Sequence, residues 1–324
     1  MTIKNTFNLF KKTKVFLIGD IMLDRYVFGK VSRISPEAPV PIFLSKNSKE
    51  MLGGSGNVLN NLISLGTDPY YLSLIGKDNN GVKIIKQLKK LNFKNYKLIV
   101  DPSRKTTVKT RYISSSQQII RVDEENSENI FKNLEIELIK KIDFFIKNKD
   151  VIIISDYNKG IITKRVSEYI INKGNSLKIP VIIDPKNKNF NIYKNATLIT
   201  PNQLEASLVT DLPCNNNKEA EICAKNIIKK FSIKNVLITR GSEGLSYIGK
   251  KKNIIHQPTK KIEVFDVSGA GDTVMAVLSV CISNNIPVKK SLELANSAAG
   301  IVVGKIGTST INLSELFKED QLFV

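Results

Sequence analysis

Apolar runs alternate along the chain with stretches in which apolar residues recur every three or four positions. The first run, 14–19, ends at a glycine and is typical of a strand buried in a parallel sheet. Further apolar runs predict strands at 70–75, 151–154, 181–183, 196–199 and 236–239. The helical period predicts helices at 55–65, 82–91, 134–146, 166–173, 220–231, 271–283 and 288–301. This alternation predicts an α/β fold, a mostly parallel sheet flanked by helices on both faces.

Two segments depart from this pattern. Residues 26–45 hold Pro36, Pro39 and Pro41 between short β-like pieces, and residues 105–122 form a second β-rich stretch. We expect both to leave the α/β core and to pair into a small sheet over the site, with lid segments at about 23–45 and 104–122. Neither a repeat nor a linker divides the chain, so we expect one domain over 1–324. The polar residues before Lys14 predict a short, loose extension.

Composition narrows the functional classes. The 324 residues are 42% hydrophobic, enough for a sizeable core. The net charge of +19 could indicate nucleic acid, a membrane surface or anionic substrates. The excess is mostly evenly spread lysine, without a basic arm interleaved with aromatic residues, which favours an ordinary enzyme. We therefore expect neither nucleic acid nor a membrane as a partner.

Cysteine and histidine usage excludes several kinds of site. The three cysteines form no Cys-x-x-Cys pair, which argues against disulfides and zinc and fits a reducing cytoplasm. His256 is the only histidine, so a His-rich metal site is excluded and a Ser-His-Asp triad is not expected. We expect His256 in a strand. No apolar run reaches transmembrane length, and the N-terminus lacks the apolar core of a signal peptide.

Residues 266–273, Asp-Val-Ser-Gly-Ala-Gly-Asp-Thr, precede an apolar helical run. Gly269 and Gly271 let the backbone approach a ligand, and N–H groups at a helix start form an anion hole suited to a phosphoryl group. A carboxylate in that hole, Asp272, can take the proton of an attacking hydroxyl. The alternative is a glycine-rich turn capped by an aspartate.

Residues 52–58, Leu-Gly-Gly-Ser-Gly-Asn-Val, also open a predicted helix. Leu59 stands where a dinucleotide fingerprint needs its third glycine, and the P-loop pattern is absent from the chain. We interpret the segment as a loop against sugar hydroxyls, with Asn57 as a polar contact. The alternative is a helix start with small residues for close packing.

Residues 200–205, Thr-Pro-Asn-Gln-Leu-Glu, follow a predicted strand. Asn202 and Glu205 project on one side of a helical turn and could hold Mg²⁺ through water. The same spacing suits a helix N-cap with a capping-box glutamate, and both interpretations can hold together.

The order and spacing of these segments, with Asp20 and Asp24 before them and Thr-Arg-Gly at 239–241, resemble the ribokinase/PfkB family of carbohydrate kinases from Lys14 onward. The resemblance implies a ribokinase-like fold with a β lid, ATP and Mg²⁺, and often a homodimer through the lid. It implies that Asp272 is the base and that Gly269, Ala270 and Gly271 supply the anion hole. It places Asn202, Gln203, Leu204, Glu205, Thr239 and Gly241 at Mg·ATP, and Asp20, Asp24, Gly53, Gly54 and Asn57 at the sugar. Ser268 stands where the family usually has threonine.

Longer runs at 19–26, 32–41, 155–160, 184–186 and 302–310 resemble a narrower group, the D-glycero-β-D-manno-heptose 7-phosphate kinases. The run Ser-Arg-Ile-Ser-Pro-Glu-Ala-Pro at 32–39 is long and specific. The resemblance implies phosphorylation of O1 by ATP, for ADP-heptose and lipopolysaccharide core synthesis. In many bacteria this kinase is fused to an adenylyltransferase whose His-x-Gly-His motif needs two histidines, so we expect a stand-alone kinase or a kinase half.

The substrate phosphate needs cationic partners, and arginine suits bidentate phosphate contacts. Five residues are candidates: Arg25, Arg33, Arg111, Arg121 and Lys186. The sequence leaves open a kinase of another sugar phosphate or a nucleoside, a nucleotide-binding relative without activity, and a basic nucleic-acid binder.

Overall fold

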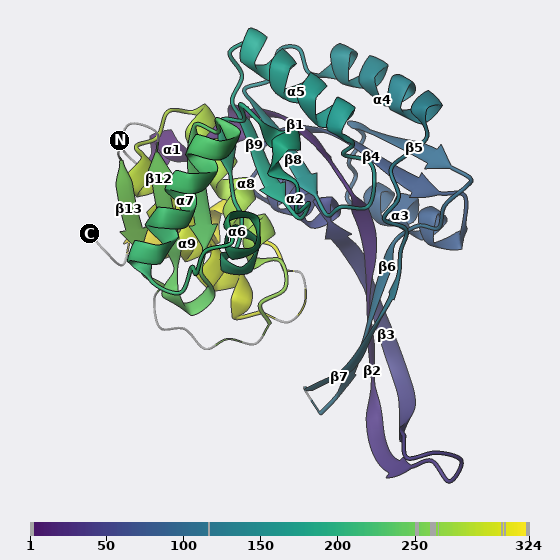
Figure 1. The fold of residues 1–324 in the computed structure, drawn as a ribbon. Coiled ribbons are helices and arrows are strands. Elements are labelled where there is room, and N and C mark those ends of the chain that lie inside the picture. The colour runs from purple at the N-terminus through teal and green to yellow at the C-terminus, as the bar shows by residue number, and fades with distance from the viewer. Residues whose placement is uncertain are drawn as a thin grey trace.

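Nine strands form the main sheet, in the order β13-β12-β11-β10-β9-β8-β1-β4-β5 (Figure 1). The computed structural model describes residues 3–115, 117–249, 253–259, 264, 266–305, 307 and 309–321. Neighbours from β11 to β5 pair in parallel, while β12 and β13 add antiparallel strands at one edge. The strands are β1 (Lys14–Gly19), β4 (Asp68–Gly76), β5 (Tyr96–Asp101), β8 (Val151–Asp156), β9 (Val181–Pro185), β10 (Leu198–Ile199), β11 (Asn235–Thr239), β12 (Leu245–Gly249) and β13 (Ile254–Gln257).

Helices cover both faces of this sheet because its central strands are apolar on both sides. In β1, Val15 and Leu17 point into one core while Phe16 and Ile18 point into the other. The first core is closed by α1 (Ile3–Lys12), α2 (Ser55–Ser64), α3 (Asn79–Lys90), α8 (Ala270–Ser283), α9 (Val288–Val303) and α10 (Leu313–Gln321). The second is closed by α4 (Lys132–Phe145), α5 (Lys164–Ser176), α6 (Gln203–Thr210) and α7 (Asn217–Phe231), with short 3₁₀ turns η1 (Phe190–Tyr193) and η2 (Gly241–Glu243) nearby. The predicted fold class is confirmed.

A second, four-stranded sheet of order β3-β2-β6-β7 projects from the body as a long ribbon (Figure 1). Its strands are β2 (Ile21–Ile34), β3 (Pro41–Gly54), β6 (Val108–Ser114) and β7 (Gln117–Glu124). The prediction that the two β-rich segments pair is confirmed, although β2 begins before, and β3 and β7 end after, the predicted segments. Pro36 and Pro39 lie between β2 and β3, where no ladder N–H is needed. Since β2 starts two residues after β1 ends, the second sheet meets the main sheet at its carboxyl edge.

The prediction of a loose N-terminal extension is wrong. Residues 3–12 form α1, whose Phe10 is fully buried and packs edge-on against Phe317 of α10. Ile3, Phe7 and Phe10 recur at helical spacing in the sequence. The lysines and asparagines between them make the segment polar on average, so this short amphipathic pattern is hard to recognise. His256 lies in β13, as expected. Of the motif at 302–310, Ile306 and Thr308 lie outside the described residues.

Within the described residues, no helix has both the length and the apolar character needed to cross a membrane.

Candidate active site

Asp272 lies in the first turn of α8, at a cavity of about 260 Å³ between the main sheet and the second sheet. Its side chain is buried, with 4% of the residue exposed. Asn57 Nδ2 donates to one carboxylate oxygen at 2.8 Å, and the Tyr157 hydroxyl donates to the other at 2.8 Å. The cavity is lined by Met22, Asp24, Gly54, Lys109, Arg111, Arg121, Tyr157, Ser268, Gly269 and Asp272.

Burial raises the pKa of Asp272 from 3.8 to about 7. The nearby Asp184 carboxylate adds to the rise, while the hydrogen bonds from Asn57 and Tyr157 and the charge of Lys186 oppose it. A carboxyl group with a pKa near neutrality suits general-base chemistry, because it is deprotonated at working pH yet basic enough to take a proton.

The anion site is predicted at the backbone N–H groups of Gly269, Ala270 and Gly271, and the structure gives the surroundings of these groups. Gly269 adopts φ 83° as the N-cap of α8. The Ala270 N–H donates to Val267 O at 3.3 Å, so it is already used. The N–H groups of Gly271 and Asp272 lie in the first helical turn, where no intrahelical acceptor exists. These two groups, at the positive end of the helix, are the donors that an anion can use.

Asp20 does not face the cavity as a free carboxylate. Its Oδ2 accepts the backbone N–H groups of Tyr157 at 2.8 Å and Lys159 at 3.2 Å, and its Oδ1 accepts that of Ile161 at 3.5 Å. Burial raises its pKa to about 6, against these hydrogen bonds. In this structure Asp20 therefore fixes the loop after β8, and its predicted contact with sugar remains a prediction.

Asp24 lies in β2 and lines the cavity, where Arg111 Nη1 of β6 contacts its Oδ1 at 2.6 Å. Burial raises the pKa of Asp24, and the Arg111 charge opposes that rise. Gly53 leaves room for this carboxylate, since a Cβ at position 53 would lie 2.1 Å from Asp24 Oδ2 and would force the side chain to move. The arrangement places a buried carboxylate and a guanidinium at the second-sheet side of the cavity.

Asn57 lies in the first turn of α2, whose N-cap is Gly54 at φ 57°. Its Nδ2 is bound to Asp272, but its buried Oδ1 has no hydrogen-bond partner among the described residues. A buried amide oxygen without a donor is costly unless a ligand supplies one. This orphan acceptor fits a hydroxyl donor such as a sugar.

Lys186 lies apart from the cavity lining, on the side of the Asn202–Glu205 motif. Its Nζ contacts Glu205 Oε1 at 2.7 Å and Asp184 Oδ2 at 3.7 Å, and it lies 5.9 Å from the centre of the Tyr157 ring. The two carboxylates raise the pKa of Lys186, so it stays charged. Lys186 therefore lies beside the predicted nucleotide motif, and its contact with the substrate phosphate remains a prediction.

Asn202 and Glu205 form the capping box that the alternative interpretation predicted. Asn202 Oδ1 accepts the Glu205 N–H at 2.9 Å, and Glu205 Oε2 accepts the Asn202 N–H at 2.8 Å. Because Lys186 occupies Oε1, both oxygens are engaged. No group of three metal-binding side chains occurs in the described part of the chain. The residues fit Mg²⁺ held mainly by nucleotide phosphates, with Glu205 and Asp184 reached through water, better than a protein cage.

The remaining nucleotide-motif residues lie around the end of β11. Thr239 forms an isolated bridge with Asn202, which joins the two predicted nucleotide segments. Gly241 adopts φ 54°, and nothing lies within 4 Å of where its Cβ would be. Gln203 Nε2 donates to Cys214 O at 2.9 Å, and Leu204 is 66% exposed on α6. The strand end thus has open space beside it.

The arginine candidates divide between the two faces of the second sheet. Arg111 and Arg121 line the cavity. Arg25 does not: it contacts Glu50 Oε1 at 2.8 Å and Asn80 Oδ1 at 3.1 Å. As the neighbour of Asp24 in a strand, Arg25 must point to the opposite face, so its predicted place at the substrate is wrong. Arg33 is exposed near the far end of β2.

Besides the apolar Met22, sequence reasoning missed two polar residues of the cavity lining. Lys109 alternates with Arg111 and therefore faces the same side of β6. Tyr157 belongs to the run Ser-Asp-Tyr-Asn-Lys-Gly at 155–160, in which the resemblance assigns no role to a single residue. Both signals were present, the first in strand alternation and the second in the position after an apolar run.

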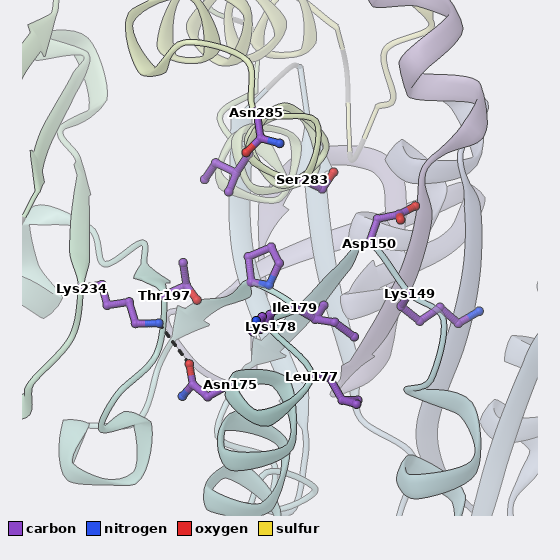
Figure 2. Close-up of a pocket in the computed structure, with 12 residues that line it drawn as sticks. Lys149, Asp150, Asn175, Leu177, Lys178, Ile179, Thr197, Lys234, Ser283 and Asn285 are labelled. Carbon is purple, nitrogen blue, oxygen red and sulfur yellow. Dashed lines mark hydrogen bonds between the residues drawn. The ribbon is translucent and has the colours of Figure 1, made fainter.

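A larger hollow, of about 630 Å³, lies at the opposite edge of the main sheet, where the parallel strands begin (Figure 2). Lys149, Lys178 and Lys234 surround it, and Lys234 Nζ contacts Asn175 Oδ1 at 3.1 Å. Size alone would favour this hollow as the site. We favour the smaller cavity, because it contains the buried carboxylates and lies at the carboxyl ends of the strands, where open α/β sheets bind ligands.

The geometry agrees with comparisons with known proteins. The family described as pfkB family carbohydrate kinase matches residues 12–315. Bifunctional protein HldE of Trichlorobacter lovleyi is 38% identical over 97% of this chain, and that of Campylobacter concisus 41% over 94%. The chain spans only 64% of the length of each of these two relatives.

Solved structures share the fold at lower identity. Phosphofructokinase-2 from Escherichia coli, in complex with substrates and products, superposes with a TM-score of 0.79 at 16% identity, over 94% of this chain and 97% of that one. Arabidopsis thaliana ribokinase, complexed with ribose and ATP, has a TM-score of 0.73 at 18% identity, over 95% of this chain and 98% of that one.

Proposed function

The chain belongs to the pfkB family of carbohydrate kinases, and we propose that it transfers the γ-phosphoryl group of ATP to O1 of D-glycero-β-D-manno-heptose 7-phosphate. The product is the 1,7-bisphosphate, a precursor for ADP-heptose. The narrower motif resemblance and the 36–41% identity to proteins named HldE support the heptose substrate. The single observation that carries the proposal is the buried Asp272 carboxyl beside a helix N-terminus, facing a cavity lined with cations.

In the proposed reaction, Asp272 accepts the proton of the attacking hydroxyl, since its pKa of about 7 leaves it available near neutral pH. The free N–H groups of Gly271 and Asp272 donate to the transferring phosphoryl oxygens, where negative charge develops. The charged Lys186 side chain lies between this site and the Asn202–Glu205 motif, so it is placed to pair with nucleotide phosphate. Mg²⁺ bound with the nucleotide would neutralise phosphate charge.

We propose that Lys109, Arg111 and Arg121 bind the phosphate that the substrate already carries. All three line the cavity, opposite Asp272. Lys109 contacts Asp123 at 2.9 Å and Glu125 at 3.3 Å, while Arg121 contacts the same Asp123 at 3.0 Å. Because Glu125 also pairs with Lys159 at 2.8 Å, three cations share two carboxylates and one positive charge is left unmatched. A phosphate supplies the missing anion, and a site built around that group discriminates strongly against substrates without it.

The second sheet is the proposed lid, and we propose that two copies of the chain pair through it. Strand β7 is exposed along most of its length, and Ile120 and Val122 are 54% and 44% exposed. Ile34 and Leu44 on the neighbouring hairpin are 60% and 49% exposed. Exposed apolar side chains on a projecting sheet favour an interface with another protein surface. Sedimentation equilibrium of the wild type and an Ile120→Lys variant tests the dimer.

The substrate assignment is tested by kcat/KM for ATP-dependent phosphorylation of the heptose, heptose 7-phosphate and fructose 6-phosphate. We expect heptose 7-phosphate to be preferred by up to ~10⁴-fold over the unphosphorylated heptose. Arg121→Ala should reduce this preference, whereas Arg33→Ala, which removes an exposed arginine of the same sheet, should leave it unchanged. Equal values for the two heptoses would refute the phosphate site. Faster turnover of fructose 6-phosphate would reassign the enzyme to another sugar phosphate.

A further inference from the structure

The Tyr157 side chain touches the candidate base, and the mechanism above gives it no role. Its hydroxyl donates to Asp272 Oδ1 at 2.8 Å, and its ring lines the cavity. The phenol has its own pKa raised well above 10 by burial and by the Asp272 charge, so it remains a donor. Tyr157 is thus a permanent hydrogen-bond partner of the carboxylate.

The loop that carries Tyr157 is held in place from three directions. The Asp20 carboxylate accepts the backbone N–H groups of Tyr157 and Lys159. On the other side, Arg104 Nη1 donates to Lys159 O at 2.8 Å, and Lys159 Nζ contacts Glu125 Oε1 at 2.8 Å. These contacts tie the loop both to the end of β1 and to residues that follow β7.

The turn itself depends on local backbone geometry. Asn158 adopts φ 57° and its N–H donates to Asp156 Oδ1 at 2.7 Å. Gly160 adopts φ 90°, and a Cβ there would lie 1.9 Å from Glu128 O. A loop fixed at so many points holds its one cavity-facing aromatic side chain, Tyr157, in a single position, as a precise catalytic arrangement requires.

We propose that Tyr157 is a positioning residue for Asp272, whose hydroxyl holds the carboxylate in the orientation in which it can take the proton of the attacking sugar hydroxyl. The inference rests on the proposed kinase function. Asn57 holds Asp272 Oδ2 and Tyr157 holds Oδ1, so the carboxylate plane is fixed from two elements. Each carboxylate oxygen has a second lone pair, which leaves room for the substrate hydroxyl.

Removal of the hydroxyl has a consequence beyond geometry. A hydrogen bond to the ionised carboxylate lowers its pKa, so its loss raises the pKa of Asp272 further above 7. The acidic limb of the pH profile of kcat then moves to higher pH. The other charged groups around Asp272 are unchanged in such a variant: Asp184 and Lys186 at the end of β9, and Asp24, Lys109, Arg111 and Arg121 from the second sheet.

The test is Tyr157→Phe, which keeps the ring and deletes the donor. We expect kcat to fall about 10–10²-fold, the scale on which misplacement of a reacting group acts, with little change in KM. The acidic limb should move to higher pH. Tyr169→Phe is the matched control, because Tyr169 OH donates to Asp143 Oδ1 at 2.9 Å and Tyr169 packs on the face of the main sheet opposite to the one that α8 covers.

A second measurement separates this inference from the proposed function. In protein labelled with ¹³C at the aspartate carboxyl carbon, the Asp272 signal is identified by its loss in Asp272→Asn, and its titration is followed without substrate. A higher titration midpoint in Tyr157→Phe supports the contact even if no sugar is phosphorylated, in which case only the kinase proposal fails. Unchanged kcat, unchanged pH limb and an unchanged midpoint in an active enzyme would overturn the role of Tyr157.

Discussion

Asp272→Asn separates the catalytic role of this residue from its effect on stability. The substitution preserves shape but removes the proton acceptor, so we expect turnover to fall about 10²–10⁴-fold. Folding should be preserved, because the Tyr157 hydroxyl can still donate to the remaining amide oxygen. Asn57 can meet the new amide with its Oδ1, which has no partner among the described residues.

The same variant should change how stability depends on pH. The rise in the pKa of Asp272 from 3.8 to about 7 corresponds to roughly 4 kcal/mol. Because the folded-state pKa lies above the unfolded one, this contribution is fully present below pH 3.8 and is lost as pH rises through 7. Between pH 5 and pH 8 the wild type should lose about 3 kcal/mol through this residue alone, and the variant should not.

The assay combines ATP turnover with urea unfolding of both proteins at pH 5 and pH 8. Asp20 and Asp156, with pKa values of about 6 and about 7, titrate in both proteins, so the difference between them isolates Asp272. Asp68→Asn, at an exposed carboxylate of β4, controls for the loss of one charge. Near-normal turnover would remove Asp272 from the mechanism. Equal pH dependence of the two unfolding free energies would refute the buried-carboxyl argument.

Three further substitutions probe the rest of the site. Glu205→Gln should raise the Mg²⁺ concentration for half-maximal activity with little change in melting temperature. The capping hydrogen bond can persist in this variant, while the ion pair with Lys186 is lost. A lower melting temperature with an unchanged metal titration would leave Glu205 only its capping role. Gly53→Ala should destabilise the fold, by 1–3 kcal/mol or more in urea unfolding, because its Cβ would overlap Asp24 Oδ2. Gly271→Ala should not destabilise the fold, because nothing lies within 4 Å of the added Cβ, and stability should rise by up to ~1 kcal/mol. We expect kcat/KM to fall, because the added methyl group lies where the phosphoryl group is proposed to bind. Unaltered kinetics would place the phosphoryl group elsewhere.

The strands of the main sheet could be predicted because each is marked by a short apolar run in its own segment of the sequence. The apolar run at 14–19 became β1 with the same bounds, since a strand buried on both faces has few alternatives. Edge elements were harder to predict. Strand β5 has only two buried residues of six, Ile99 and Asp101, so its pattern resembles a loop. Helix α1 depends on a contact between Phe10 and Phe317, which no local window contains.

The site was predictable to the extent that its residues lie in motifs. Asp272 and Asn57, which are 215 residues apart and were both predicted at the site, lie within hydrogen-bond distance of each other. The faces of the second sheet were not predicted, although alternation along β2 separates Asp24 from Arg25. Asp20 could not be assigned from sequence, because its partners are backbone N–H groups of a loop 137–141 residues away.

Buried carboxyl groups, which cost folding stability when they are ionised, gather near the carboxyl ends of the parallel strands. Asp20, Asp156 and Asp272 are buried carboxyls whose pKa values are all raised by burial, to about 6, 7 and 7. Each is retained with specific donors: backbone N–H groups for Asp20, the Tyr193 hydroxyl for Asp156, and Asn57 and Tyr157 for Asp272. A core optimised for stability alone would not keep three such groups together. Two of the three fix the loop that carries Tyr157, and the third receives its hydrogen bond, so the carboxylates act as one unit that positions the candidate base.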